Sequence, residues 1–434
     1  MIDLQLLRNP EFTEQLQNAA KSKHMDFDAY QLAATFDERR LVAGQLDRAR
    51  AQHKALSARF RDADAETRAA LSQEMSGYAA ELKTLRARLQ DVEARLADLA
   101  LRAPSIPDPL VPIGSSDEDN EVIREVGEPR VMADGMLDHI ELARRMGMVD
   151  FERAQKFAGA RSYALTGNGM LLARAVLTMA LDLLVARGFT PVMPPVLVRE
   201  EAMTGTGYFP LGVDDAYKTD REDRYLVGTS EVSLVSLHRD ETLRPEDMPI
   251  RYAGISSCFR REAGSYGRDT HGLYRVHQFD KVEQVSIIPA DDALQAAEQL
   301  SLLANSEAVL KALELPYRVA IACTGETGQG QRLKYEVETW MPSRGAYSET
   351  HSCSSFGDFQ ARRSNIRYRT AAGESVFAYT LNNTAVAVPR ILIPLLEHHQ
   401  RPDGSVRVPD ALRSYLNGVA ELRPGTSSET LVPG

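Results

Sequence analysis

The first hundred residues show a regular spacing of apolar positions that predicts two long helices. Nine apolar residues within 71–99 follow one another at alternating steps of four and three. This spacing places them on one face of a helix, as in the a and d positions of a coiled coil. A looser series with similar steps lies within 32–60, and the polar stretch 61–67 separates the two series. The pattern predicts an antiparallel helical hairpin, preceded by a short helix with Pro10 in its first turn.

The pattern changes after a proline-rich segment at 103–109, because proline disfavours helix and favours a stiff, extended connection. We expect an amphipathic helix at 168–187 and strands at the β-rich runs 225–227, 274–277 and 282–288. Several of these runs have no long helical crossover between them, which favours a largely antiparallel sheet over a doubly wound one. The predicted fold class is therefore α+β, with helices flanking the sheet. The expected parts are a helical arm at 1–103, a proline-rich linker at 104–112, a second domain at 113–421 and a disordered tail at 422–434.

The charge of the chain is unevenly distributed. A net charge of −10 over 434 residues argues against a protein that coats nucleic acid by bulk charge. Residues 37–102, however, contain 13 Lys and Arg against 11 Asp and Glu, which gives +2 and leaves −12 for the remainder. A non-acidic arm is a modest indication of a polyanionic partner. A dimerisation coiled coil or a spacer is the alternative.

The composition favours a cytosolic protein. The N-terminus has no basic stretch followed by an apolar one, and no apolar run approaches the ~18 residues that a membrane span needs. Three cysteines, Cys258, Cys323 and Cys353, are too few to crosslink a chain of this length, so reduced thiols are expected. They lack the short spacing of zinc ligands, and no zinc is expected.

Two segments could bind a nucleotide. Residues 325–330 have the G-x4-G skeleton of a phosphate loop, but the lysine and hydroxyl residue that should follow are missing, which favours an ordinary glycine-rich turn. Arg260, Glu262 and Phe279 flank a polar, glycine-containing loop. An arginine can bind phosphate oxygens, a carboxylate can accept from the adenine amino group, and an aromatic ring can stack on the base. From composition alone, a charged hairpin with surface ion pairs is the simpler interpretation.

Several motifs resemble those of a known family. The run Phe259-Arg260-x-Glu262 followed by Arg275-x-x-x-Phe279 resembles motif 2 of class II aminoacyl-tRNA synthetases, while 187–197 and 385–397 resemble motifs 1 and 3. The resemblance to bacterial-type seryl-tRNA synthetases extends over residues 1 to about 421, and it rests further on the runs 228–232, 268–270, 276–283, 352–363 and 403–406. The N-terminal hairpin is similar to the tRNA-binding arm of that family.

The resemblance implies an activity. Serine and ATP would give seryl-adenylate, and the seryl group would pass to the 3′ end of serine tRNA, with selenocysteine tRNA as a further acceptor. It implies a class II catalytic domain at 113–421, Mg²⁺ bound with ATP, no active-site zinc, no membrane association and a cytoplasmic homodimer packed through motif 1.

The resemblance also implies site residues. The matching ATP-binding positions are Arg260, Arg261, Glu262, Arg275, Val276, Phe279, Glu349, Thr350, His351, Ser352 and Arg390. Of these, Arg260 and Arg390 match catalytic positions, and Glu349 and Ser352 match positions that bind Mg²⁺. The matching serine-binding positions are Thr229, Ser230, Glu231, Arg260, Glu283, Asn382 and Thr384. The expected tRNA contacts are arm residues 30–100 and the motif 2 loop residues Gly264, Arg268 and His271.

Serine selection has a physical basis in these residues. Glu283 and Thr384 are candidates for the substrate hydroxyl, and Glu231 for its ammonium group. A site that hydrogen-bonds the hydroxyl rejects alanine, because alanine leaves buried polar groups unpaired. Rejecting threonine needs steric closure, which the sequence does not show.

The chain departs from the family pattern at three places. His271 stands where the family often has Arg, Thr350-His351 replaces Ile/Val-Ser, and Asn382-Asn383-Thr384-Ala385 replaces Asn-Gly-Ser-Gly. Two other functions compete with tRNA charging. A ligase that loads a carrier protein would not need the hairpin. A non-catalytic paralogue should have lost one of Arg260, Glu262, Phe279, Glu283 and Arg390, and all are present.

Overall fold

The computed structural model describes residues 1–263 and 272–425. Its internal contacts divide the chain into two compact units, Met1–Ile106 and Pro107–Gly434. Most of the tail expected at 422–434 lies outside the described residues.

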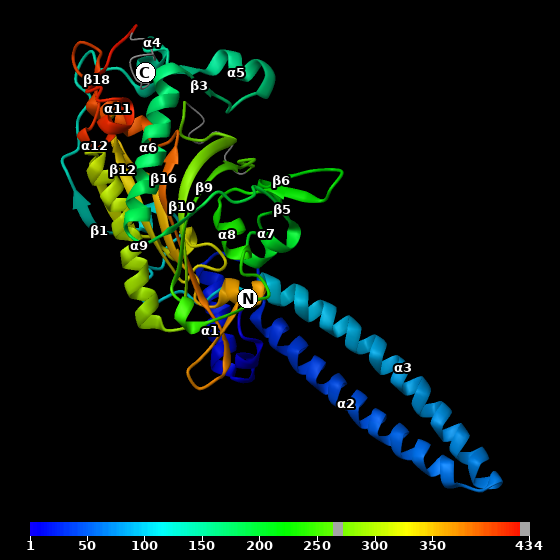
Figure 1. Cartoon of the computed structure of the whole chain (residues 1–434). Coiled ribbons are helices and arrows are strands. Elements are labelled where there is room, and N and C mark those ends of the chain that lie inside the picture. Colours follow the sequence, from blue (N-terminus) through cyan, green and yellow to red (C-terminus); the bar gives the residue numbers. More distant parts are fainter. Residues whose placement is uncertain (264–271, 426–434) are drawn as a thin grey trace. The chain divides into compact units, whose positions relative to one another are not determined.

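The first unit contains the helical hairpin predicted from the sequence (Figure 1). The short helices η1 (Leu4–Arg8) and α1 (Pro10–Ser22) precede the long helices α2 (Ala29–Asp62) and α3 (Ala65–Arg102). Aspartates begin both long helices: the carboxylate of Asp28 accepts from the backbone N–H groups of Tyr30 and Gln31, and that of Asp64 accepts from Thr67. Such caps satisfy N–H groups that have no partner within the helix. The turn is therefore shorter than the polar stretch suggests.

Apolar residues of the seam hold α2 against α3. Leu46 and Ala49 of α2 pack on Leu82 of α3, and a larger cluster that includes Leu32 and Leu96 lies nearer the chain's N-terminal helices. Ion pairs between the two helices, such as Arg88 with Glu38, are exposed and contribute little to stability.

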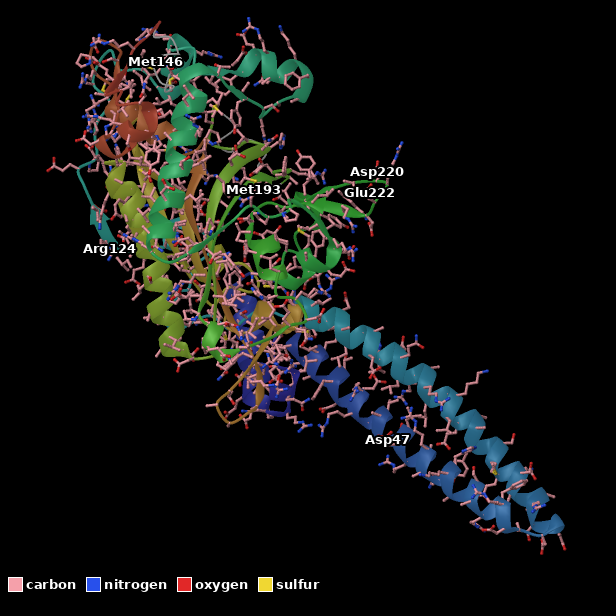
Figure 2. All side chains as sticks on the ribbon, viewed as in Figure 1. Asp47, Arg124, Met146, Met193, Asp220 and Glu222 are labelled. Atoms are coloured by element: carbon pink, nitrogen blue, oxygen red, sulfur yellow. The ribbon has the colours of Figure 1, made fainter. Side chains whose placement is uncertain are left out.

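The second unit is built on an eight-stranded sheet in the order β1-β11-β12-β13-β16-β10-β9-β4. Only β4 pairs in parallel with its neighbour, so the sheet is antiparallel as predicted. Its strands are β1 (Glu121–Val126), β4 (Thr190–Val192), β9 (Ile250–Phe259), β10 (Gln278–Ile288), β11 (Tyr317–Ile321), β12 (Leu333–Met341), β13 (Ala346–Ser355) and β16 (Tyr379–Val388). The short strands are β2 (Val149–Asp150), β3 (Ala164–Leu165), β5 (Leu197–Arg199), β6 (Tyr217–Lys218), β7 (Arg224–Leu226), β8 (Thr242–Leu243), β14 (Arg367–Arg369), β15 (Ser375–Phe377), β17 (Val406–Arg407) and β18 (Glu421–Leu422). The side chain of Met193, directly after the edge strand β4, is 83% exposed (Figure 2).

Helices cover one face of this sheet. The helices of the unit are α4 (His139–Arg145), α5 (Phe151–Ala158), α6 (Gly167–Ala186), α7 (Glu200–Thr206), α8 (Glu231–Ser236), α9 (Asp292–Ala312), α10 (Phe359–Ser364), α11 (Leu392–His399) and α12 (Asp410–Arg413). Helices α6 and α9 pack on each other and on β10 and β16. Gln284 and Asn383 point toward α9, where they bond Asn305 and the Leu302 carbonyl. Since side chains alternate along a strand, Glu283 and Thr384 face the opposite side of the sheet.

Helix α6 is more apolar than the amphipathic helix expected at 168–187. By length and composition alone it could cross a membrane, the one such helix among the described residues, although half of the apolar stretch is buried. Its buried residues, including Leu172, Val176 and Leu184, belong to the main apolar cluster of the unit. The hydrophobicity is accounted for by packing on the sheet.

One predicted strand is absent, which corrects the expectation for 274–277. Strand β10 begins at Gln278, and Tyr274–His277 form a bent segment before it. The carbonyl of Tyr274 accepts from the Arg390 side chain, and the N–H of His277 donates to the carbonyl of Arg161. The backbone of this segment therefore bonds Arg390 and Arg161 and does not pair with a neighbouring strand among the described residues. The helix expected at 168–187 and the strand expected at 282–288 are confirmed as α6 and part of β10.

Candidate active site

Two adjoining pockets open on the face of the sheet opposite α9. The first, here named the arginine pocket, is lined by Arg260, Glu262, Leu273, Tyr274, Val276, Phe279, Lys281, Glu349, Thr350, His351, Ser352, Thr384, Ala387, Val388, Pro389 and Arg390. The second, named the glutamate pocket, is lined by Thr206, Gly207, Tyr208, Thr229, Glu231, Arg260, Lys281, Glu283, Gly328, Gln329, Gly330, Gln331, Lys334, Glu349, Ser352, Ser354, Phe356, Asn382 and Thr384. They share Arg260, Lys281, Glu349, Ser352 and Thr384. A molecule with two parts could therefore occupy both.

The end of β9 directs the motif 2 residues into the arginine pocket. Arg260 follows the strand directly, and its guanidinium lies 5.4 Å from the centre of the Phe279 ring on β10. Glu262 has a φ of 54°, a left-handed conformation that is costly for a residue with a side chain. Its carboxylate pairs with Arg275 at 3.0 Å, and its carbonyl accepts from Arg161 at 3.1 Å. These contacts hold the strained corner in place.

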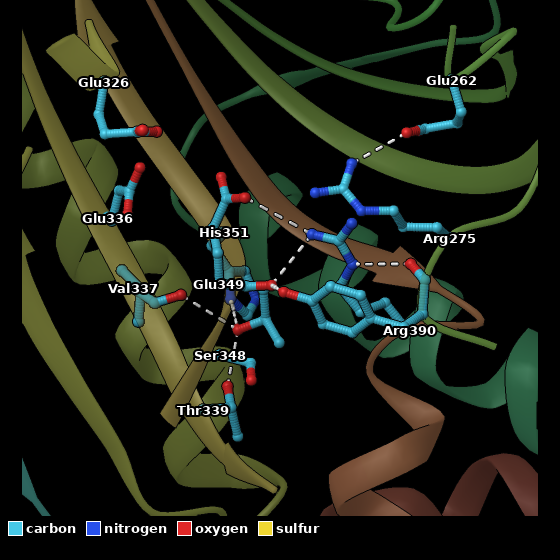
Figure 3. Close-up of polar contacts among 12 residues, drawn as sticks. Glu262, Arg275, Glu326, Glu336, Val337, Thr339, Ser348, Glu349, His351 and Arg390 are labelled. Carbon is cyan, nitrogen blue, oxygen red and sulfur yellow. Dashed lines mark hydrogen bonds and ion pairs between the residues drawn. The ribbon is translucent and has the colours of Figure 1, made fainter. Parts of the chain in front are cut away.

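Arg390 connects motif 3 to β13 (Figure 3). Its Nη1 lies 3.0 Å from the carbonyl oxygen of Glu349 and 3.6 Å from the carboxylate, and its Nε donates to the carbonyl of Tyr274 at 3.2 Å. The guanidinium also lies 4.3 Å from the centre of the Tyr274 ring. Burial would raise the pKa of Glu349, but Lys334, Arg390 and Arg260 lower that pKa below its ordinary value. Glu349 is therefore an ionised carboxylate on the wall between the two pockets.

Two buried carboxylates, those of Glu231 and Glu283, line the glutamate pocket. Glu283 forms an ion pair with Lys281 and accepts from the hydroxyl of Thr384 at 3.2 Å. Glu231, at the start of α8, accepts from Gln360 at 2.6 Å and lies 3.4 Å from the hydroxyl of Tyr208. Burial and the nearby Glu283 raise the pKa of Glu231 to about 7. This half of the site can accept a cation and a hydroxyl group.

Some predicted residues lie outside the two pockets. The hydroxyl of Ser230 points to the carbonyl of Gly254, 3.5 Å away, and Arg261 is exposed and donates to the carbonyl of Asp214 at 2.9 Å. Arg275 lies behind Glu262, with a buried Nε that has no hydrogen-bond partner among the described residues. The motif 2 loop residues Gly264, Arg268 and His271 lie outside the described residues.

The departures Thr350 and His351 form a β-bulge, since the pairing of β12 with β13 shifts between Val337 and Glu338. The Thr350 hydroxyl is 2.6 Å from that of Thr339 and 2.8 Å from Nδ1 of His351, so it faces β12 (Figure 3). Burial lowers the pKa of His351 to about 4, which keeps the imidazole neutral.

Sequence reasoning missed several pocket residues. Lys281 and Tyr274 lie within the motif 2 region but match no position that the resemblance assigns. Tyr208 lines the glutamate pocket and Gln360 lies behind Glu231, and both are distant from Glu231 along the chain. The glycine-rich run singled out in the sequence contributes Gly328–Gly330 to the rim of the glutamate pocket, and Gln331 fixes this turn through the N–H of Gly328 and the hydroxyl of Ser354.

Comparisons with known proteins agree with this geometry. Residues 1–107 match the model of the seryl-tRNA synthetase N-terminal domain, and residues 216–399 match that of the tRNA synthetase class II core domain (G, H, P, S and T). A serine–tRNA ligase from Synechococcus elongatus is 41% identical over 96% of this chain and 98% of its own. The chain belongs to the seryl-tRNA synthetase family. The family and fold class predicted from the motifs are thereby confirmed.

Other relatives show the same similarity. A serine–tRNA ligase from Deinococcus radiodurans is 50% identical over 74% of this chain and 75% of its own. The crystal structure of seryl-tRNA synthetase from Pyrococcus horikoshii complexed with ATP has a TM-score of 0.92 and 32% identity, covering 98% of this chain and 100% of that one. The cytoplasmic serine–tRNA ligase from Naegleria fowleri in complex with AMP has a TM-score of 0.86 and 27% identity, covering 98% and 99%.

The neutral state of His351 predicts a pH-dependent contribution to stability. Between about pH 4 and 6.5 the unfolded chain binds a proton at this position and the folded chain does not, so folding becomes less favourable as the pH falls through this range. Urea unfolding at pH 7.5 and 5.5 should show a smaller acid loss of stability in His351→Asn than in the wild type. His24→Asn is the matched control, because His24 is exposed and its φ of 53° suits asparagine. If His351→Asn and the wild type lost the same stability at pH 5.5, the neutral His351 would not be a cause of the acid loss.

Proposed function

We propose that this chain is a serine–tRNA ligase that forms seryl-adenylate from L-serine and ATP and transfers the seryl group to the 3′ end of serine tRNA. The observation that carries the proposal is the pair of adjoining pockets with Arg260 between them. One pocket offers arginines and an aromatic ring to a nucleotide, and the other offers carboxylates and a hydroxyl group to a small amino acid. Solved relatives hold ATP and AMP.

The arginine pocket has the groups that ATP needs. Phe279 and Val276 would contact the purine, and Glu262 would accept from its amino group. Arg260 and Arg390, which line this pocket, and Arg275 from behind Glu262 would bind the phosphates, because a planar guanidinium binds two oxygens at once.

Glu349 and Ser352 fit the proposed Mg²⁺ position. Mg²⁺ usually binds through one or two carboxylates together with substrate phosphates. Glu349 is held ionised, and both residues line the two pockets. Among the described residues no group of three or more His, Cys, Asp or Glu could hold a metal, which agrees with a site completed by the nucleotide. Mg²⁺ would neutralise charge on the phosphates.

The glutamate pocket would orient serine. The ammonium group would bind Glu231, the hydroxyl would bind Glu283 and Thr384, and the carboxylate would lie beside Arg260, with Thr229 and Asn382 completing the wall. The serine carboxylate then attacks the α-phosphate, an oxygen–phosphorus bond forms, and pyrophosphate leaves with the electron pair of the broken bond. The terminal ribose hydroxyl of tRNA attacks the acyl carbon and releases AMP. No enzyme nucleophile is needed, and catalysis rests on orientation and charge stabilisation.

The helical arm would bind tRNA. Lys83 and Arg86 on α3 are exposed, and neither has a carboxylate partner among the described residues. Arg88 and Arg95, by contrast, pair with Glu38. Unpaired cations can bind backbone phosphates, and this binding should weaken as salt rises. We place the protein in the cytoplasm, where charging takes place.

A groove beside α6 supports a homodimer. The α5–α6 groove is lined by Ala154, Phe157, Ala158, Arg161, Ser162, Tyr163, Leu165, Met170, Ala173, Arg174, Leu177, Thr178, Tyr217, Leu226, Ile255, Phe259, His277, Gln278 and Asp280. Phe157 is 85% exposed and Met170 is half exposed, which is costly for a monomer in water. Helix α6 leads directly into motif 1, so a second copy is the proposed partner.

Separate substitutions distinguish the two units. Arg260→Ala should abolish serine-dependent ATP–pyrophosphate exchange, because the α-phosphate loses its charge partner. Lys83→Ala with Arg86→Ala should leave exchange unchanged and lower tRNA charging about tenfold or more at physiological salt. Exchange is the internal control for folding of the arm variant. Normal charging by the arm variant would refute the assignment of the arm, and exchange by Arg260→Ala would refute that of the pocket.

The dimer is tested by sedimentation. Phe157→Asp should shift the protein from dimer to monomer at micromolar concentration, because a carboxylate would be buried in an apolar interface. Ile113→Asp is the matched control, since Ile113 is also 85% exposed and does not line the groove. A dimer that persists in Phe157→Asp would place the interface elsewhere.

A further inference from the structure

We propose that Gln360 is a positioning residue for amino-acid recognition: its amide holds the Glu231 carboxylate facing the glutamate pocket and thereby sets how well the site takes the substrate ammonium. The inference rests on the proposed function, since it concerns the group that Glu231 would bind. Gln360 itself does not line the pocket and lies in α10, on the far side of Glu231.

The orientation of the Gln360 amide is determined by its neighbours. Its Nε2 lies 3.1 Å from the carbonyl oxygen of Thr206, which can only accept, so the NH2 group must face that carbonyl. The hydroxyl of Thr380 lies 2.6 Å from Oε1 and donates to it. A flipped amide would lose the bonds to Thr206 and Glu231, because it would place Oε1 against a carbonyl oxygen and a carboxylate oxygen, while the Thr380 hydroxyl could accept from the NH2 group instead. The same Nε2 therefore has one hydrogen for Thr206 and one for Glu231.

The bond to Glu231 is short and well protected from water. Nε2 of Gln360 lies 2.6 Å from Oε1 of Glu231, and Gln360 is 1% exposed. The other oxygen, Oε2, lies 3.4 Å from the Tyr208 hydroxyl. Because Gln360 bonds Oε1 from the side away from the pocket, the Glu231 carboxylate cannot rotate freely, and the substrate ammonium group binds an acceptor of fixed orientation. Hydrogen bonds from neutral donors to a buried carboxylate are among the stronger ones in proteins.

The charge state of Glu231 depends on the same bond. Burial and Glu283 raise the pKa of Glu231 to about 7, while the bond from Gln360, the charge of Lys281 and a smaller contribution from a hydrogen bond with Asn382 oppose the rise. The other titratable or charged groups that line the pocket are Tyr208, Arg260, Lys334 and Glu349. An ammonium group binds an ionised carboxylate far better than a neutral acid. Removing the Gln360 donor should therefore raise this pKa further, so that productive serine binding begins only at higher pH.

The test is the pH profile of serine-dependent ATP–pyrophosphate exchange by the full chain between pH 6 and 9. In Gln360→Leu the acid limb of kcat/KM for serine should move up by about one pH unit, and the KM for serine at pH 7.5 should rise about tenfold. The KM for ATP should change by less than about twofold, since the arginine pocket is untouched. Thr380→Val, which frees the amide while keeping Gln360, should move the limb in the same direction by a smaller amount.

Gln299→Leu is the matched control. Gln299 is also buried, but among the described residues its amide donates to the carbonyls of Leu333 and Cys353, so the acid limb should stay in place. An unmoved limb in Gln360→Leu, or equal rises in the KM for serine and for ATP, would overturn the inference. If Gln360→Leu does not fold, an unmoved limb in Thr380→Val overturns it. Failure of the proposed function is distinguishable, because the wild-type chain would then show no serine-dependent exchange.

Discussion

Buried charge is the constraint on which the second unit depends. An ionised group without a partner inside a protein is strongly destabilising, so each charge on the pocket face of the sheet needs an opposite charge, a hydrogen bond or a ligand beside it. Glu283 pairs with Lys281 and accepts from Thr384, and Glu349 pairs with Arg390. The apolar helices α6 and α9 cover the other face, and the alternation of side chains along β10 and β16 directs the polar residues into the pockets.

The features that the sequence predicted are those that depend on residues close together along the chain. The seam of α3 follows from a fixed step between apolar residues, and the strand at 282–288 from its β-branched run. Within the site, Arg260 and Glu262 are two residues apart, and Asn382 and Thr384 lie on one face of one strand. Local spacing alone indicated Arg260, Glu262 and Phe279, and the family resemblance implied the rest of the candidate site.

The remainder depends on contacts between distant segments. Gln360 and Tyr208 meet Glu231 only because α10 and the residues after α7 pack against α8, and no local pattern marks them. Tyr274–His277 have the composition of a strand, yet their backbone forms hydrogen bonds with Arg390 and Arg161 instead. The side chains of Ser230 and Arg261 sit within matching motifs but turn away from the pockets.

Paired charges build the glutamate pocket, and we propose that it takes an amino acid through its hydroxyl group. The most direct measurement is ATP–pyrophosphate exchange with serine, alanine, glycine, cysteine and threonine under identical conditions. Serine should support exchange with a kcat/KM about 10⁴-fold above that of alanine, because alanine has no hydroxyl group to bond the buried Glu283 and Thr384. Exchange with alanine within tenfold of serine, or faster exchange with another amino acid, would contradict recognition of serine through its hydroxyl group.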